Sequence, residues 1–362
     1  MHMAIELAER AHGQTSPNPM VGAVIVRGDE IVGQGYHQKA GTPHAEVVAL
    51  REAGERARGA TLYINLEPCC HQGKTPPCTE SIIKAGIARV VAAMVDPNPL
   101  VSGAGFRRLR VAGIEVDYPV LEGQARRLNE AFITFHLEKR PFTIAKWAMT
   151  LDGRTSSDSG DARWISNDAS REYSHRLRAS VDAVAVGVNT VFFDNPKLNV
   201  RLHGYDRKQP ARVIFDGRLR IPLGARCLDS SGGQAIIVTT PNGPRDRIER
   251  LKKAGHKVLV VPGKGRIVDI GIALQMLAGC GIQSILVEGG RGLHTSLLKS
   301  GLADKIIVFV GPRIIGGRLM TAPLTDLGIP RFQMALDLKN VETRTFGTDV
   351  CIEGYINLPS KR

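Results

Sequence analysis

The sequence predicts an α/β protein built from two domains. Three observations predict it: strand-like and helix-like segments alternate along the chain, 362 residues exceed the usual size of one domain, and charge is shared unevenly. Residues 1–142 carry 16 Lys and Arg against 15 Asp and Glu, whereas residues 143–362 carry 32 against 20. Because Pro141 interrupts the pattern where the charge changes, we expect one domain in residues 1–142 and another in residues 143–362.

The first half predicts a mixed or parallel sheet covered by helices, since strands and helices follow each other in turn. Strands are expected at Val21–Val26, Ile31–Tyr36, Thr61–Leu66 and Arg89–Met94. Helices are expected at 3–12, His44–Arg56, Thr79–Ala85 and 122–138.

The second half repeats the alternation with different segments, so it predicts a second sheet. Strands are expected at 142–150, 183–187, 212–216, 235–240, 257–261, 284–288 and 305–310, with a β-rich hairpin pair over Phe332–Leu358. Helices are expected at 167–179, 244–254, 268–279 and 293–300.

Composition narrows the class of protein. The chain is 43% apolar and 23% charged, with no apolar run of membrane-spanning length and no secretory signal at its start, so we expect a cytoplasmic protein without a membrane partner. The net charge of +13 lies almost entirely in the second half. A basic half suits phosphorylated small molecules as well as polyanions. The sequence has no long Lys/Arg run of the kind that indicates nucleic-acid binding.

Three of the six cysteines crowd into residues 69–78, which favours a metal over disulfides in a chain without a secretory signal. His44 begins one predicted helix, Cys78 lies just before another, and Cys69 follows a predicted strand. One imidazole and two thiolates would bind zinc and leave its fourth position for water, as catalytic zinc requires. Glu46, two residues beyond His44, would then move the proton from that water to a leaving amine.

The H-x-E and P-C elements match the pattern of zinc deaminases, except that eight residues, not two, separate Cys69 from Cys78. Two other interpretations remain open. His44 can be a simple helix cap among buried cysteines, or the zinc can be structural, with Cys70 or His71 as fourth ligand. Gly73-Lys74-Thr75 is not a phosphate loop, because Pro68 stands where that motif needs its first glycine.

The second half carries a glycine-rich turn, Glu288-Gly289-Gly290-Arg291-Gly292, between a predicted strand and a predicted helix. Such a turn lets backbone N–H groups approach a pyrophosphate. No G-x-G-x-x-G follows the first strand of this half, so a Rossmann site is not predicted. By itself the turn is weak evidence, because many strand–turn–helix units are rich in glycine.

A resemblance to a known family strengthens both predictions. The segments that carry it in the first half are Pro17-Asn18-Pro19, Gly35-Tyr36-His37, His44-Ala45-Glu46 and the EPCCHQGKTPPC stretch ending at Cys78. Those in the second half are Lys146, Thr150–Thr155, Trp164-Ile165-Ser166, Gly187–Thr190, Asp194-Asn195-Pro196, Leu198, Arg201 and Val287–Gly290. In this order, over essentially the whole chain, they resemble the bifunctional deaminase/reductase family of riboflavin synthesis. The resemblance implies a cytidine-deaminase-like domain followed by a dihydrofolate-reductase-like domain.

The resemblance also implies roles for individual residues. Zinc would bind to His44, Cys69 and Cys78, with Glu46 as the catalytic acid/base; the first substrate would contact Asn18, His71 and Lys74. NADPH would contact Trp164, Thr190, Asp194, Gly290, Arg291, Gly292, Leu293, His294, Thr295 and Ser296. The ribose-phosphate substrate would contact Lys146, Arg178, Leu198, Arg201 and Glu288. Ala162 departs from the family, which often has a hydroxyl residue there.

The chemistry of these residues supports their implied roles to different degrees. The guanidinium groups of Arg178 and Arg201 can bind two phosphate oxygens at once. Without the resemblance, the two residues would be interpreted as ordinary solvated arginines. Trp164 could equally be a core or interface aromatic. Lys146, Asp194 and Glu288 are unranked candidates for a general acid of the reductive step.

The expected function is two reactions on one small phosphoribosyl pyrimidine: hydrolytic loss of the 2-amino group, then NADPH-dependent reduction of the ribosyl group at C1′. The family also implies a homo-oligomer, a dimer or tetramer. Two alternatives from other classes are a nucleic-acid base deaminase with an accessory domain and a zinc-bearing regulatory module. The near-neutral first half and the long loop between the cysteines argue against the nucleic-acid reading.

Overall fold

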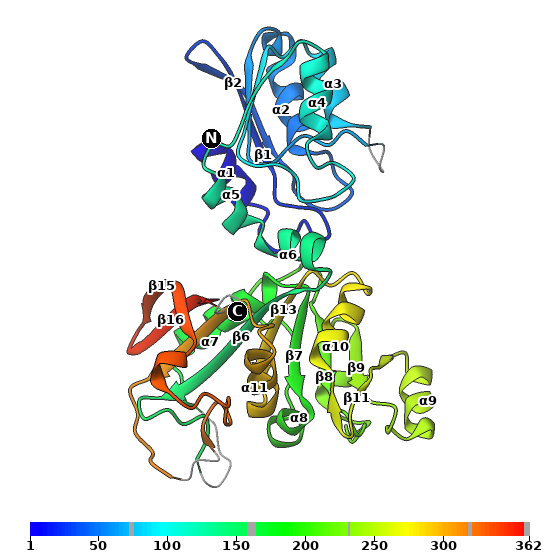
Figure 1. Ribbon diagram of the computed structural model, residues 1–362, viewed down its shortest axis with the longest axis vertical. Helices are drawn as coiled ribbons and strands as arrows, with labels where there is room; N and C mark the ends of the chain where they lie inside the picture. The colour runs from blue at the N-terminus through cyan, green and yellow to red at the C-terminus, as the bar shows by residue number, and fades with distance from the viewer. Residues whose placement is uncertain (72–75, 158–163, 231, 318–320, 358–362) are drawn as a thin grey trace. The chain divides into compact units, whose positions relative to one another are not determined.

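The computed structural model describes residues 1–71, 76–157, 164–230, 232–317 and 321–357 (Figure 1). The chain forms two compact units, Met1–Arg140 and Pro141–Arg362. Each unit contains its own main sheet and its own hydrophobic core. Among the residues described, no helix has the length and apolar character needed to cross a membrane.

The first unit is built on a five-stranded sheet in the order β2-β1-β3-β4-β5. Its strands are β1 Gly22–Arg27, β2 Glu30–Tyr36, β3 Thr61–Ile64, β4 Arg89–Ala92 and β5 Glu115–Asp117. Strand β1 is antiparallel to both β2 and β3, whereas β3, β4 and β5 are mutually parallel. Strands β2 to β5 therefore all run in one direction and end at the same edge of the sheet.

Helices cover both faces of this sheet, so the unit has three layers (Figure 1). Successive side chains of a strand point to opposite faces. Ala23 and Ile25 accordingly pack with the helices of one face, and Val24 packs with α1 on the other. The first face holds α2 Ala45–Ala53, α3 Cys78–Lys84 and α4 Ala104–Val111. The second face holds α1 His2–Glu9 and α5 Glu122–Leu128. Helix α6 Glu130–Glu138 clusters with Leu66 and Met94, just beyond the ends of β3 and β4.

The single helix expected over residues 122–138 is wrong, because α5 and α6 are separate helices divided at Asn129. Asn129 is buried, and its side-chain amide accepts the N–H of Met20 at 2.8 Å and donates to the Met20 carbonyl at 2.9 Å. This long-range tie holds Asn129 at φ −108° and ψ 25°, outside helical geometry. Helix α4 and strand β5 were also not anticipated.

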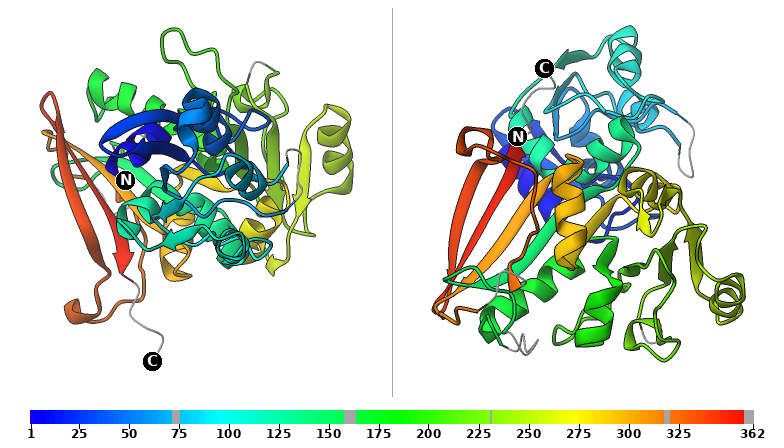
Figure 2. Two further views of the ribbon diagram at one scale, coloured as in Figure 1. Left: turned by 90° about the horizontal axis from the view of Figure 1, so that it is seen from above. Right: turned by 60° about the horizontal axis from the view of Figure 1, so that its bottom comes forward.

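The second unit is built on a nine-stranded sheet in the order β10-β9-β8-β7-β13-β6-β14-β16-β15. The strands from β10 to β14 in this order are parallel, and the hairpin of β15 and β16 is added antiparallel at one edge (Figure 2). The strands are β6 Phe142–Thr150, β7 Ala183–Gly187, β8 Ala211–Phe215, β9 Ala235–Thr239, β10 Lys257–Val260, β13 Ser284–Gly289, β14 Lys305–Gly311, β15 Asp337–Phe346 and β16 Asp349–Asn357.

Two hydrophobic clusters fill the two faces of this sheet. On β7, Ala183 and Ala185 belong to one cluster, and Val184 and Val186 belong to the other. The helices of this unit are α7 Asp168–Ala179, α8 Val188–Asp194, α9 Arg245–Lys253, α10 Ile270–Ala278 and α11 Arg291–Lys299. Helix α8 and the small hairpin of β11 Gly263–Lys264 and β12 Ile267–Val268 were not anticipated from sequence.

A buried carboxylate fixes the loops at the strand ends of the first unit. Glu67, just after β3, is 3% exposed. Its oxygens accept four backbone N–H groups: those of Asp96 at 3.1 Å, Gly103 at 2.8 Å, Gly105 at 2.9 Å and Phe106 at 3.2 Å. Glu67 thus caps the N-terminus of α4 and joins the segments that follow β3 and β4.

Replacing Glu67 with Ala is expected to lower the free energy of unfolding of the first unit by at least about 3 kcal/mol, because four buried N–H groups lose a charged acceptor. Hydrogen exchange of the β3 and β4 amides measures this unit separately. Glu55→Ala, at an exposed position, is the control. Equal protection in the two variants would show that the carboxylate is not needed.

Candidate active sites

The strand-end edge of the first unit gathers the residues expected to form a deaminase site. Asn18 precedes β1, His44 lies between β2 and α2, and Cys69 follows β3. Cys78 is the first residue of α3, and His44 is the N-cap residue of α2. Glycines of β2 allow α2 to lie close, since a Cβ at Gly33 would meet the Ala49 carbonyl oxygen at 2.3 Å.

His44, Cys69 and Cys78 form a compact cluster of ligand atoms, all within 4.8 Å of one another. The Nδ1 atom of His44 lies 3.2 Å from the Cys78 sulfur and 3.7 Å from the Cys69 sulfur. Tetrahedral zinc with ordinary bond lengths sets nitrogen and sulfur ligands about 3.5 Å apart. The donor set and its spacing therefore fit zinc without a large rearrangement.

The two cysteines are electrostatically prepared for a cation. A hydrogen bond from the Cys78 thiol lowers the pKa of the Cys69 thiol to about 4, and the same bond raises the pKa of Cys78. The backbone N–H of Cys78 also points to the Cys69 sulfur at 3.4 Å. One sulfur of the pair is therefore a thiolate near neutral pH, the form that binds metals.

Glu46 lies in the first turn of α2 and is 3% exposed. Burial, followed by the negative charge of Cys69, raises the pKa of its carboxyl to about 7. Within the part of the chain that is described, neither Cys70 nor His71 belongs to the ligand cluster. Three candidate ligands beside a buried carboxyl fit the pattern of a catalytic zinc site better than that of a structural site, which uses four protein ligands.

Asn18 belongs to a small polar network that sequence reasoning had not assembled. The Nδ1 of buried His37 lies 3.1 Å from the Pro43 carbonyl, so Nδ1 carries the proton and Nε2 accepts the Asn18 amide at 3.0 Å. The rings of His37 and His44 meet edge to face, with centroids 5.3 Å apart. The Gly35-Tyr36-His37 segment was the only signal of this contact in the sequence. Among the residues that the structure describes, the buried Nδ1 of His71 has no hydrogen-bond partner; Lys74 lies outside them.

In the second unit, the charged side chains of Arg178, Glu288 and Lys146 lie close together. Arg178 of α7 donates to the Glu288 carboxylate of β13 through Nε at 2.9 Å and Nη2 at 2.6 Å. Lys146 of β6 lies near both. Burial lowers the pKa of the Lys146 ammonium. Although burial alone would raise it, the pKa of Glu288 is lowered by Arg178 and Lys146.

The glycine-rich turn lies against the neighbouring β7–α8 turn. A Cβ at Gly289 would meet the Thr190 hydroxyl at 2.9 Å, and Gly290 has φ +98° and lies close to Gly187. Only glycine allows this approach and this backbone conformation together. The turn thereby leads directly into α11, whose first residues are Arg291 and the exposed Gly292.

Further along this segment, four side chains already have contacts within the protein. His294 is 2% exposed, its Nε2 lies 3.1 Å from the Val287 carbonyl, and burial lowers its pKa to about 4. The Thr295 hydroxyl donates to the Arg291 carbonyl, and the Ser296 hydroxyl donates to the Gly292 carbonyl. Leu293 packs against the core. Backbone N–H groups near Gly290 are therefore the part of the turn best placed for a ligand.

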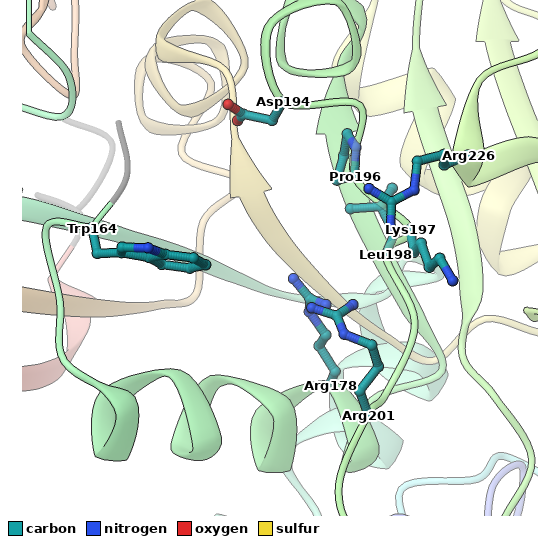
Figure 3. A pocket seen from close by; sticks show the side chains of 8 residues that line it. All are labelled: Trp164, Arg178, Asp194, Pro196, Lys197, Leu198, Arg201 and Arg226. Carbon is teal, nitrogen blue, oxygen red and sulfur yellow. The ribbon is translucent and has the colours of Figure 1, made fainter. Parts of the chain in front are cut away.

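A pocket of about 330 Å³ collects most of the other expected residues (Figure 3). Trp164, Arg178, Asp194, Leu198 and Arg201 line it. Pro196, which carried the resemblance but was given no role, also lines it, as do Lys197 and Arg226, which the sequence had not indicated. Trp164 is 59% exposed, and the Arg171 guanidinium lies 4.1 Å from the centroid of its ring. Trp164 is thus not a core residue. Ala162 lies outside the described residues.

Comparison with known protein families assigns both units. Residues 1–94 match the cytidine and deoxycytidylate deaminase zinc-binding region, and residues 141–352 match the RibD C-terminal domain. The riboflavin biosynthesis protein RibD of Aquifex aeolicus is 46% identical over 97% of this chain and 96% of its own length. The RibD protein of Escherichia coli is 39% identical over 97% of each chain.

Solved structures agree over the full length. RibD of Acinetobacter baumannii superposes with a TM-score of 0.89 at 38% identity, covering 99% of this chain and 98% of that one. A Thermotoga maritima protein, described as a diaminohydroxyphosphoribosylaminopyrimidine deaminase/5-amino-6-(5-phosphoribosylamino)uracil reductase, gives 0.83 at 36% identity, covering 99% and 97%. The chain therefore belongs to the RibD family of riboflavin biosynthesis, and it is a bifunctional enzyme with an N-terminal deaminase domain and a C-terminal reductase domain.

Proposed function

We propose that this enzyme carries out two successive reactions on one small phosphoribosyl pyrimidine. The first is hydrolytic deamination of 2,5-diamino-6-ribosylamino-4(3H)-pyrimidinone 5′-phosphate. The second is NADPH-dependent reduction of the ribosyl group, which gives 5-amino-6-(5-phosphoribitylamino)uracil. The observation that carries the proposal is the cluster of His44, Cys69 and Cys78 beside buried Glu46, in one chain with a basic pocket of reductase type.

In the deaminase domain, His44, Cys69 and Cys78 would hold zinc. Bound zinc supplies a Lewis acid that lowers the pKa of water. Glu46 would take a proton from the attacking water and return it to the departing amine, so that water and the amino carbon give a carbonyl and ammonia. A carboxyl whose pKa is raised to about 7 can perform both transfers near neutral pH. Asn18, oriented by His37, would bind the pyrimidine ring, and His71 and Lys74 would help to hold the substrate.

In the reductase domain, Arg178, Leu198, Arg201 and Glu288 would hold the ribose-phosphate substrate. The ribosyl ring opens to an imine, and C1′ accepts a hydride while a proton is taken up. Of the three candidate acids, Lys146 fits best, because burial lowers the pKa of its ammonium and makes it a stronger proton donor. Glu288 is held as a carboxylate by Arg178, and Asp194 lies at the exposed rim of the pocket.

NADPH is the proposed source of the hydride, which the dihydronicotinamide supplies when bound. Trp164, Thr190 and Asp194 would contact the cofactor together with the segment Gly290–Ser296. The support comes from the close approach of Gly289 and Gly290 to the β7–α8 turn and from the exposed start of α11, where backbone N–H groups favour a pyrophosphate. The preference for NADPH over NADH rests on the family.

The proposal includes a homo-oligomer, a dimer or tetramer, as the family implies. Strand β15 supports it, because it forms the edge of the nine-stranded sheet and most of its side chains are exposed. Such an edge presents unpaired backbone groups, which proteins usually cover or pair.

For the deaminase, Glu46→Gln should abolish ammonia release while the protein keeps zinc, and Cys78→Ser should lose both. The difference follows from the proposed roles, because Glu46 moves protons whereas Cys78 is a ligand. Zinc content is measured by metal analysis, and ammonia is measured directly. Both variants should still reduce the deaminated substrate. Ammonia release by Glu46→Gln at the wild-type rate would contradict the role of this carboxyl.

For the reductase, Lys146→Met should lower kcat for NADPH oxidation at least about 100-fold, the usual contribution of a positioned acid, with ammonia release unchanged. Lys305→Met is the matched control, since Lys305 is also a partly buried lysine of this sheet but pairs with Glu353. Steady-state kinetics with the deaminated substrate provide the measurement. If the Lys146→Met enzyme is as active as the control, Lys146 is not the general acid, and Asp194 and Glu288 become the candidates.

A further inference from the structure

The pocket of the reductase domain is lined by more basic side chains than the acidic side chains around it neutralise. Four basic side chains line it: Arg178, Lys197, Arg201 and Arg226. Glu288 neutralises Arg178 through two hydrogen bonds. Among the residues that the structure describes, the Arg201 guanidinium donates only to the neutral amide oxygen of Asn199, at 2.9 Å.

Within the described chain, the Lys197 and Arg226 side chains form no hydrogen bond or ion pair. Asp194 is the one acid among the described residues that line the pocket. Three basic residues, Lys197, Arg201 and Arg226, therefore line the pocket with one exposed carboxylate, that of Asp194.

The cations approach from two sides. In Figure 3, the Arg178 and Arg201 guanidinium groups lie side by side, and Arg226 extends toward them from the opposite wall near Lys197. Beyond the effect of burial, Arg178 and Arg226 lower the pKa of Arg201, as expected for like charges at short range. Like charges that are held together with fewer acidic partners than cations are typical of a site for an anion.

The backbone around Lys197 and Arg226 is fixed before any ligand binds. Asn195, at φ +40°, accepts the backbone N–H of Arg226 through its side-chain oxygen at 2.8 Å. Leu198, at φ +55° and 1% exposed, anchors the other side of Lys197 in the core. The short helix η2 Arg226–Leu228 is anchored by its buried residues Cys227 and Leu228. This preorganisation lowers the entropy lost when a ligand is held.

We propose that Lys197 and Arg226 form, opposite Arg178 and Arg201, a second wall of a phosphate-binding site in the reductase pocket. The inference rests on the proposed function and deepens it, because it assigns two further residues to ligand binding. A phosphate monoester dianion matches the surplus charge, and an arginine fork matches its oxygens. Two reactants of the proposed reaction carry such a group: the substrate at its 5′ position and NADPH at its 2′ position.

The test uses the full-length, zinc-loaded enzyme with Arg226→Gln, Lys197→Gln and the double variant. Arg250→Gln, at an exposed position on α9, removes the same charge away from the pocket and is the control. The Michaelis constants are measured for the deaminated substrate, its dephosphorylated nucleoside, NADPH and NADH. Binding of inorganic phosphate is measured by calorimetry at constant ionic strength, which needs no turnover.

The double variant should raise the Michaelis constant of one phosphorylated reactant about tenfold or more, as expected for loss of a charge-assisted hydrogen bond, and should weaken inorganic phosphate binding similarly. An effect on the substrate but not on its nucleoside identifies the 5′-phosphate. An effect on NADPH but not on NADH identifies the 2′-phosphate. Arg226→Lys should recover part of the loss.

The inference is wrong if all four constants and phosphate binding stay within twofold of the Arg250→Gln control. That failure differs from failure of the proposed function, in which the wild-type enzyme oxidises no NADPH with either pyrimidine. In that second case the calorimetric measurement still decides whether Lys197 and Arg226 bind phosphate.

Discussion

Parallel alignment of neighbouring strands is the constraint on which both sites depend. In the first unit, the antiparallel strand β1 separates β2 from β3, so these two strands run in the same direction and end at one edge. The segments that follow β2, β3 and β4 therefore supply His44, Cys69 and the loop held by Glu67 at the same place. In the second unit, β13 lies between β7 and β6, parallel to both, which brings Glu288, the α8 turn and Lys146 together.

The surroundings of three buried glutamates give them different chemistry. Glu67 meets four backbone N–H groups and is a structural cap. Glu288 meets a guanidinium that holds it as an oriented carboxylate. Glu46 lies by an electron-rich sulfur pair, and burial brings its pKa near 7. The same side chain can therefore support, orient or transfer a proton, and its partners decide which.

The sequence predicted local features well and long-range contacts poorly. Most strands, the cluster of His44, Cys69 and Cys78, and the glycine-rich turn could be predicted because short spacings and helix starts encode them. The break at Asn129 was missed because it depends on Met20, 109 residues away. Helix α8, seven residues long, is too short for its periodicity to be distinctive. Lys197 and Arg226 carry no motif, and only the packing of their loops brings them to one pocket.

The central claim is that one chain performs deamination and then reduction on the same molecule. The most direct measurement gives the wild-type, full-length enzyme the diamino substrate with NADPH and follows ammonia and NADPH together in time. We expect one ammonia released per NADPH oxidised, with ammonia appearing first. Oxidation of NADPH that precedes ammonia release, or ammonia release never followed by oxidation, would contradict the account.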